Sequence, residues 1–245
     1  MAARARAWHH AGQAAVCDVI EPWAHGTVLR ATRYPDYFDF NVVRVEQDPA
    51  MSVDALVAFA DEALAGLTHR RVDFEVADAA ASLRPSFEAL GWRTERLVWM
   101  RHEGEPPPRP EIPVEEVLYD AVQHLRVAWH REDFPDHELG DFVAQAREIA
   151  LRRGAQILAV HEDDTPVAFA QLEHDGQSAE VAQVYVLPKL RGRGIGTALT
   201  RAAIDAAGEV RDLWIVADDE GRPKQLYTRF GFRATWTVIE TLRVL

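Results

Sequence analysis

One segment in the second half of the chain has the residue types and spacing of a phosphate-binding loop. Residues 184–199 read VYVLPKLRGRGIGTAL, which predicts a strand, a loop of glycines and basic residues, and a helix. Gly192, Gly194 and Gly196 lack a Cβ atom, so the backbone there can adopt positive φ and approach a ligand closely. The N–H groups at the start of the helix would then form a binding site for an anion.

Two arginines in this loop indicate which kind of phosphate ligand it would bind. Arg191 and Arg193 would add charge-assisted contacts to a pyrophosphate. The spacing does not fit a dinucleotide fingerprint, which would need glycine or alanine at Thr197 or Leu199, and the Gly-Lys-Ser/Thr of a Walker loop is absent. The pattern that remains is Arg-x-x-Gly-x-Gly at residues 191–196.

This pattern resembles the Q/R-x-x-G-x-G/A pyrophosphate motif of the GNAT superfamily of N-acetyltransferases. The strand VYVLP at 184–188 and the helix after the motif stand where that family has them. The resemblance covers residues 112–245 and implies the acyl-CoA N-acyltransferase fold, with acetyl-CoA as the acyl-donor substrate.

The resemblance also implies where acetyl-CoA binds. In the family's fold the strand before the motif diverges from its neighbour, and the pantetheine arm fills the gap like an added strand. Val184, Tyr185 and Val186 would hold the pantetheine and the thioester carbonyl through their backbone, and the Val184 N–H would stabilise the oxyanion. The implied pyrophosphate site consists of Arg191, Gly192, Arg193, Gly194, Ile195, Gly196 and Thr197.

A second family feature is LYTRFGF at 226–232. In GNAT enzymes a tyrosine at this position often protonates the leaving thiolate of CoA, and Tyr227 matches it. A phenol with a pKa of about 10 is neutral at pH 7 and can donate a proton, although a tyrosine that only packs a short helix is the alternative. Where many relatives have asparagine this chain has Glu220, so Arg222 or Lys224 would supply a phosphate contact instead.

An amine acceptor also needs a general base, because with a pKa of about 10.4 only about one amine in a few thousand is neutral at pH 7. Glu180 stands on the strand before the motif, where some GNAT members carry a catalytic glutamate. Strand alternation places it on the same face as Val184, about 13 Å away, so a water would have to relay the proton. A solvated strand-end glutamate is the alternative reading, and Glu173 and Asp133 are the other candidates.

The acceptor side is expected at residues 129–138, WHREDFPDHE, which in this fold border the acceptor pocket. Carboxylates and aromatic rings suit a cationic amine on a small molecule or peptide. A solvated polar turn is the alternative. A metal site from His130, Asp133 and His137 is disfavoured because no tight ligand pair is obvious among them, so no metal is predicted.

The proline-rich segment 103–113 predicts a linker between a domain at 1–104 and a domain at 105–245. The element order of the second domain predicts an α/β fold with a mixed central sheet and flanking helices. Its predicted strands are 114–119, 156–161, 167–173, 179–186, 213–217 and 234–244, and its predicted helices are 121–130, 139–152, 194–207 and 223–230.

The first half repeats the later part of this pattern at an offset of 140 residues, since SFEALGW at 86–92 aligns with LYTRFGF at 226–232. The counterpart of the phosphate loop, EQDPAMS at 46–52, has no glycine or arginine, and Phe87 stands where Tyr227 stands. We therefore predict two GNAT-like units in tandem, the first degenerate and without a cofactor site.

Other features of the first half carry less chemistry. The aromatic stretch 34–40 is expected in the core or along the acceptor groove, and residues 1–16 are expected to be a ragged N-terminus. The histidines at 9, 10 and 69 are expected at the surface.

Composition limits the partners. The 245 residues carry a net charge of −12, which disfavours nucleic acid, and no apolar run is long enough to cross a membrane. The single cysteine, Cys17, excludes an internal disulfide and fits the cytoplasm. A monomer or a homodimer is expected.

The sequence thus predicts an acetyl-CoA-dependent N-acetyltransferase acting on a primary amine by direct attack on the thioester. The alternatives are an acyl-CoA-binding sensor without turnover, and an immunity or resistance protein that only sequesters a ligand.

Overall fold

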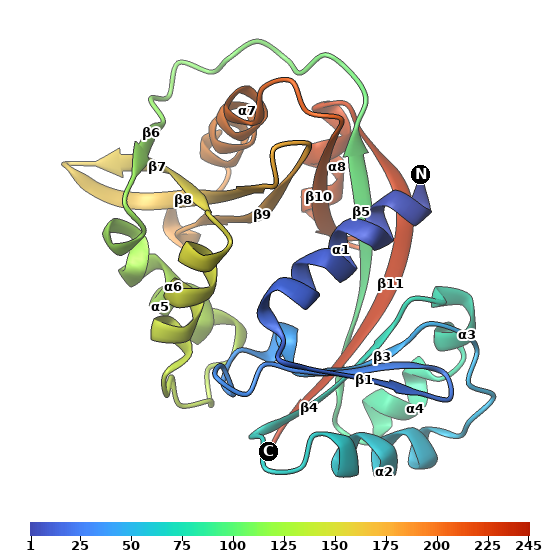
Figure 1. Ribbon diagram of the computed structural model, residues 1–245. Helices are drawn as coiled ribbons and strands as arrows, with labels where there is room; N and C mark the ends of the chain where they lie inside the picture. Colours follow the sequence, from blue (N-terminus) through green and yellow to red (C-terminus); the bar gives the residue numbers. More distant parts are fainter. The chain divides into compact units, whose positions relative to one another are not determined.

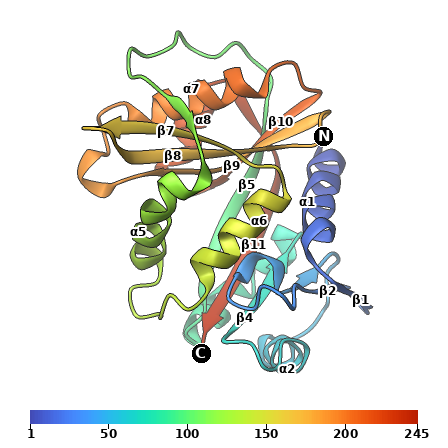
Figure 2. The same cartoon turned by 60° about the vertical axis from the view of Figure 1, so that its left-hand side comes forward.

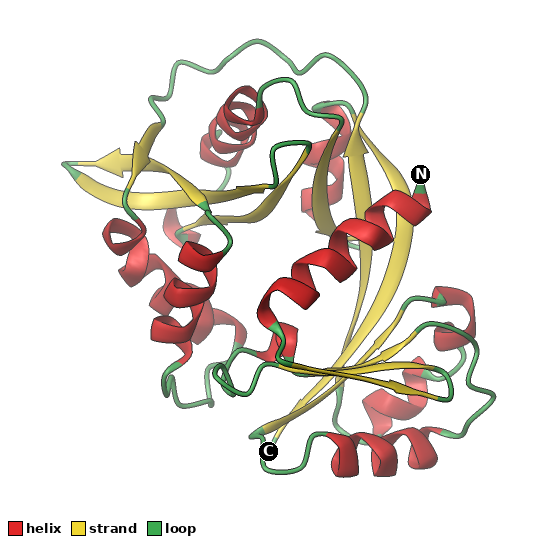
Figure 3. Ribbon diagram, viewed as in Figure 1, coloured by secondary structure: helices red, strands yellow, loops and turns green.

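A computed structural model describes residues 1–245 and confirms the mixed α/β class (Figures 1 and 3). The chain divides into two units, each with a mixed sheet and flanking helices. The first unit comprises residues 1–99, 218–220 and 235–245, and the second comprises residues 100–217 and 221–234. None of the helices has both the length and the hydropathy needed to cross a membrane.

The second unit contains a sheet with the strand order β10-β9-β8-β7-β6. Only the β9–β10 pair is parallel, whereas β6–β7, β7–β8 and β8–β9 are antiparallel. The strands are β6 (Glu115–Val117), β7 (Gln156–Glu162), β8 (Thr165–His174), β9 (Ser178–Val186) and β10 (Asp212–Asp218).

Helices cover both faces of this sheet (Figure 2). On one face, α5 (Gln123–Asp133), α6 (Phe142–Arg152) and the short 3₁₀ helix η2 (Tyr119–Val122) pack on a core that includes Phe169 and Tyr185. On the other, α7 (Ile195–Ala207) packs against β7, β8 and β9. The unit also contains η3 (Pro188–Leu190) and α8 (Arg222–Arg229).

The first unit has the strand order β1-β2-β3-β4-β11. Val43, Val45, Val72 and Phe74 of its central strands face a core shared with α2 and α4. Its elements are α1 (Ala2–Val16), β1 (Val19–Trp23), β2 (Gly26–Arg30), η1 (Phe38–Phe40), β3 (Val42–Val45), α2 (Val53–Ala63), β4 (His69–Phe74), α3 (Ala77–Ala81) and α4 (Arg84–Ala89).

The two units share an order of elements, which confirms the predicted tandem. In the first unit β3, α2, parallel β4 and α4 follow one another, as β9, α7, parallel β10 and α8 do in the second. Phe87 meets Trp92 edge-on at 5.1 Å between ring centroids, and Tyr227 meets Phe232 edge-on at 6.2 Å. Each aromatic pair is separated by the same number of residues and packs in the same way.

The predicted division at 104/105 does not account for the last strand. β5 (Arg93–His102) and β11 (Phe232–Val244) contribute residues to both units. Residues 239–244 of β11 pair with β4, so the end of the chain belongs to the first unit. Hydrophobic periodicity finds a strand, but it does not show which strand is its neighbour.

The predicted ragged N-terminus is wrong, because residues 2–16 form the helix α1. Its stabilising contacts are polar: Gln13 accepts a hydrogen bond from Arg44 at 2.5 Å, and Arg6 pairs with the buried Glu75 at 3.0 Å. A helix that docks through polar side chains lacks the apolar stripe by which a sequence reveals a buried helix.

The surface prediction is wrong for His69, whereas His9 and His10 are half-buried. His69 is fully buried beside Phe38, and burial lowers its pKa to about 4. His10 pairs with Glu75, and His9 packs edge-on against Trp99 and Trp236. The aromatic residues of the 34–40 stretch are buried in the first unit, which favours the core reading.

Candidate functional site

The glycine-rich loop leaves the backbone N–H groups at the start of α7 accessible to an anion. Gly192 and Gly194 have φ of 80° and 83°, values that side-chain-bearing residues rarely adopt, and Gly194 is the N-cap residue. No side chain caps this helix, and its first backbone bond runs from Ala198 N–H to the Gly194 carbonyl. The N–H groups at 195–197 therefore have no acceptor within the helix and remain available for an anion.

β9 and β10 diverge next to this loop. Their parallel pairing runs from Ser178 opposite Asp212 to Val181 opposite Ile215 and then stops. Residues 184–186 of β9 continue to pair with β8, so their other edge has no strand beside it. The expected gap for an extended ligand arm is present.

The hydrogen bonds of β9 show which backbone groups face the gap. Leu187, just after β9, donates its N–H to the Val167 carbonyl of β8, so alternation directs the backbone of Tyr185 to β8 and those of Val184 and Val186 to the gap. Of the three residues predicted to hold the pantetheine through their backbone, Val184 and Val186 therefore have backbone groups that face the gap, and Tyr185 does not. Tyr185 contributes its side chain instead.

The glycine-rich loop, the gap between β9 and β10, and α8 line one pocket of about 820 Å³. The pocket combines the anion site at the start of α7, the exposed edge of β9 and one face of α8. The residues that line it are Trp129, Glu132, Asp133, Val184, Tyr185, Val186, Leu190, Arg191, Gly192, Gly194, Ile195, Gly196, Thr197, Arg222, Pro223, Leu226 and Tyr227. All predicted donor-site residues except Arg193 are among them.

Tyr227 lies on α8 with its side chain almost completely buried and still lines the pocket. Burial raises the pKa of its phenol to about 12, because the charged phenolate would lose solvation. The group is therefore protonated at neutral pH, as a proton donor must be.

A β-bulge reverses the predicted face of Glu180. Val184 pairs with Ala170 and Glu180 pairs with Glu173, and the ladder shifts because Ala182 is an extra residue on β9. Positions 170 and 173 are an odd number of residues apart on β8, so they point to opposite faces. Glu180 therefore lies on the face opposite Val184, and it does not line the pocket.

The two other base candidates differ in their surroundings. Glu173 is buried and paired with Arg153 at 2.6 Å, and it accepts a hydrogen bond from Gln171 at 2.7 Å. Asp133, at the end of α5, lines the pocket. Of the three carboxylates, only Asp133 lines the pocket.

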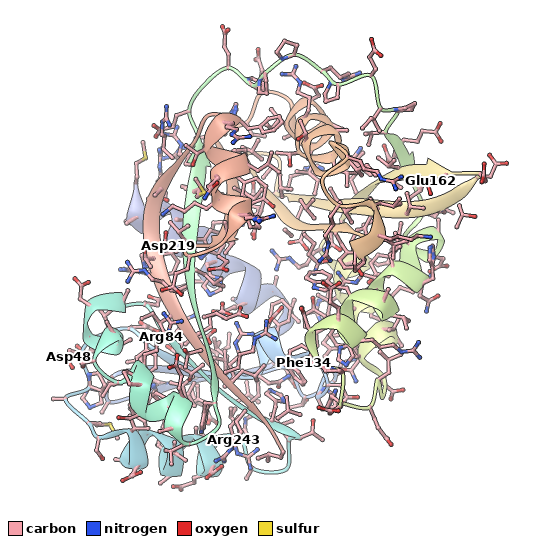
Figure 4. The ribbon with its side chains drawn as sticks, turned by 180° about the vertical axis from the view of Figure 1, so that it is seen from behind. Asp48, Arg84, Phe134, Glu162, Asp219 and Arg243 are labelled. Atoms are coloured by element: carbon pink, nitrogen blue, oxygen red, sulfur yellow. The ribbon has the colours of Figure 1, made fainter.

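Sequence reasoning expected residues 129–138 at the acceptor pocket, but it missed that Trp129, Glu132 and Asp133 share one helix and that Glu132 pairs with Arg191. The predicted helix ended at 130, whereas α5 continues to 133 and brings Trp129, Glu132 and Asp133 to the pocket. Their spacing of three and four residues is that of one helix face, which was the available signal. Phe134 just beyond the end of α5 (Figure 4) and the rest of the 129–138 segment do not line the pocket.

Arg191 is held by several groups at once. Its Nη1 and Nη2 donate to the two carboxylate oxygens of Glu132 at 2.6 and 2.8 Å, and its Nε donates to the Val186 carbonyl at 3.0 Å. Its guanidinium lies 5.7 Å from the ring centroid of Tyr185, whose hydroxyl donates to Glu132 at 3.2 Å.

Glu220, the departure from the family pattern, does not line the pocket. It pairs with Arg84 of the first unit at 3.0 Å, so its charge is compensated there. Of the two cations expected to replace the usual contact, Arg222 lines the pocket and Lys224 does not.

The corresponding loop in the first unit has different chemistry. The Asp48 carboxylate accepts the Ala50 N–H at 2.9 Å, and the Ser52 hydroxyl caps α2 by accepting the Ala55 N–H at 3.3 Å. Phe87, in the place of Tyr227, is fully buried. These amides already have acceptors, in contrast to those at the start of α7.

Comparison with known proteins agrees with this site. Residues 119–232 match the sequence model described as the Acetyltransferase (GNAT) family. An uncharacterized N-acetyltransferase of Methanocaldococcus jannaschii is 37% identical over 71 residues, which is 27% of this chain. The match spans about a third of the length of that relative, 31%.

Solved structures resemble the chain over most of its length. A functionally unknown protein from Staphylococcus epidermidis has a TM-score of 0.67 at 15% identity, with 93% of this chain and 94% of that chain covered. A GCN5-related N-acetyltransferase from Kribbella flavida has a TM-score of 0.59 at 19% identity, covering 98% and 94%. A tandem GNAT protein from the clavulanic acid biosynthesis pathway has a TM-score of 0.51 at 16% identity, covering 82% and 74%.

At these identities the solved structures show a shared fold, and the sequence match supplies the family. The phosphate loop, the diverging strands and the pocket tyrosine lie in one unit, within the segment 119–232 that matches the GNAT family of acetyltransferases.

Proposed function

We propose that the second unit transfers an acetyl group from acetyl-CoA to a primary amine on a small molecule or peptide. The family's reaction is acyl transfer from acyl-CoA, and the choice of acetyl donor and amine acceptor is our proposal. The observation that carries it is the single pocket formed by the uncapped start of α7, the unpaired edge of β9 and Tyr227.

The pocket residues fit the donor in a defined order. The amides at 192–197 would bind the pyrophosphate, and the Val184 and Val186 edge would bind the pantetheine arm as a strand binds its neighbour. Arg222 would add positive charge at the pocket wall. The donor supplies an activated acetyl group as a thioester.

The chain's residues would divide the reaction as follows. The amine nitrogen attacks the thioester carbonyl carbon, and the Val184 N–H stabilises the negative charge on the carbonyl oxygen. The C–S bond then breaks, and Tyr227 gives its proton to the thiolate sulfur. A carboxylate takes the proton from the nitrogen through water. Asp133 is best supported for this step because it lines the pocket, and Glu180 would need a longer relay.

The acceptor is proposed to be cationic in solution. Trp129 and Asp133 line the pocket with an aromatic ring and a carboxylate, groups that attract an ammonium. The absence of cysteines other than Cys17 suits work in a reducing compartment such as the cytoplasm.

Calorimetry with acetyl-CoA tests the donor site, with Gly194→Asp as the disabling variant. That change places a carboxylate at the start of α7, and Gly176→Asp makes the same change at a positive-φ glycine outside the pocket. We expect one site per chain in the wild type, loss of binding in Gly194→Asp and normal binding in the control. No binding to the wild type would overturn the proposal, and two sites would contradict the degenerate first unit.

Release of free CoA thiol against a panel of amines tests turnover. Release that depends on an amine supports the transferase, and binding without release from any amine would favour the acyl-CoA sensor instead.

A further inference from the structure

The guanidinium of Arg191 has no two-donor edge left free for a phosphate. Its three nitrogens donate to both oxygens of Glu132 and to the Val186 carbonyl, at 2.6 to 3.0 Å. A bidentate arginine–carboxylate pair is the strongest form of this contact, and its planar geometry leaves little room for a second anion. A pyrophosphate could make a bidentate contact with this guanidinium only by displacing Glu132 or the Val186 carbonyl.

The charges around the two arginines also favour Arg193 over Arg191 as the phosphate contact. Hydrogen bonds from Arg191 hold the pKa of Glu132 below its usual range, so the pair is an ionised and internally neutral unit near pH 7. Arg193 differs, since its side chain is 63% exposed and its nearest acid, Glu162, lies at 3.9 Å. Arg193 is therefore the cation of this loop that is free to turn towards a bound phosphate.

Given the proposed acetyl-CoA site, we propose that Glu132 and Arg191 are positioning residues: they clamp the acceptor-side helix α5 to the phosphate loop, and Arg193 supplies the charged phosphate contact. The clamp ties three segments together. Arg191 closes the turn at 186–191 through the Val186 carbonyl, Glu132 anchors the end of α5, and the Tyr185 hydroxyl joins both through Glu132.

This arrangement couples the two substrates. α5 carries Trp129 and Asp133 into the pocket, and the loop carries the anion site, so loss of the clamp loosens both sides. A direct phosphate ligand would affect the donor side alone.

Glu132→Gln separates the two roles by the sign of its effect. If Arg191 bound the phosphate, removing the competing carboxylate would tighten CoA binding. With the clamp, the same change weakens CoA binding by about 2- to 10-fold and raises the acceptor KM, because the charged pair is lost. Glu132→Gln/Arg191→Gln should bind CoA no more weakly than Arg191→Gln alone, because both changes break one contact.

The salt dependence of the dissociation constant is the second readout. Arg193→Gln is expected to weaken CoA binding and flatten its salt dependence, whereas the charge-neutral double variant Glu132→Gln/Arg191→Gln weakens binding and leaves that dependence as in the wild type. Asp120→Asn is the matched control, since it breaks another exposed arginine–carboxylate pair, with Arg147, outside the pocket. Thermal unfolding verifies that each variant is folded.

The possible failures are distinguishable. A wild-type protein that does not bind CoA would remove the proposed function itself. A wild type that binds, combined with tighter binding by Glu132→Gln or a flattened salt dependence in Glu132→Gln/Arg191→Gln, would overturn the clamp alone.

Discussion

Burial decides the chemistry available to Tyr227. Since burial raises its pKa to about 12, the phenol stays protonated as the pH rises through the range in which amine acceptors lose their charge. Tyr227→Phe removes the proton but keeps the ring, so kcat should fall about 100-fold while CoA affinity is unchanged. Steady-state kinetics and calorimetry on the same samples measure the two effects.

The pH profile provides an independent check on Tyr227. Because its pKa is raised, the wild type should show no loss of kcat from this group between neutral pH and pH 10. A fall in kcat below pH 10 that is absent from Tyr227→Phe would contradict the assigned pKa.

The base is a second prediction at the scale of single residues. Asp133 lines the pocket, whereas Glu180 does not. Asp133→Asn should therefore lower kcat/KM about 100-fold, and Glu180→Gln should change it less than about 3-fold. The two variants make the same chemical change, so each is the control of the other. The reverse order would return Glu180 to the role expected from the sequence.

At the scale of elements, the two ends of α7 separate binding from backbone strain. Gly194 begins the helix with φ of 83°, and Gly208 ends it with φ of 61°. Alanine at either position costs about 1 kcal/mol of stability, because both conformations disfavour a side chain. Only Gly194→Ala should also weaken CoA binding, since only that end forms the anion site. Urea unfolding and calorimetry on both variants test this, and equal CoA affinities would argue against the anion site.

Some features of the helices and strands could be predicted from the sequence, and others could not. The loop and α7 followed from local signals, because glycines and a proline mark where a strand ends and a helix begins. The divergence of β9 from β10 entered only through the family resemblance, since no residue in either strand encodes where pairing stops. The bulge at Ala182 was not predictable, and that single extra residue moved Glu180 to the other face.

At the scale of the whole chain, three acids of the first unit share one guanidinium. Arg71 pairs with Asp39 at 2.6 Å, Asp73 at 2.9 Å and Glu240 at 2.6 Å, and Glu240 lies opposite Asp73 where β11 meets β4. Burial raises the pKa of Glu240 to about 8, and one cation cannot compensate all three carboxylates. The pKa of Asp73 is raised for the same reason.

This cluster predicts how stability depends on pH. A carboxyl with a raised pKa in the folded state holds a proton that the unfolded chain has released, so its stabilising contribution is complete below about pH 4.5 and is lost as the pH rises through about 8. The free energy of unfolding should fall across this window by up to about 1.4 kcal/mol per pH unit.

Glu240→Gln should flatten that dependence, because the amide does not titrate. Glu21→Gln makes the same change at an exposed position of β1 and is the control. Urea unfolding followed by circular dichroism at a series of pH values supplies the measurement. A slope equal to that of the wild type in Glu240→Gln would assign the pH dependence to other groups.

The sequence by itself determined the chemistry of the phosphate loop, the order of elements in the second unit, the 140-residue repeat and the loss of the site in the first unit. These features are encoded by residues close together in the chain: glycine positions, prolines and the period of apolar side chains. Only the tertiary structure decided that α5 completes the pocket through Glu132 and Asp133, that Arg191 is held by Glu132, that β11 returns to β4, and that residues 2–16 form a helix docked through polar contacts. Each of these depends on contacts between residues far apart in sequence, or on a one-residue shift in a strand ladder, and neither leaves a periodic signal in the chain.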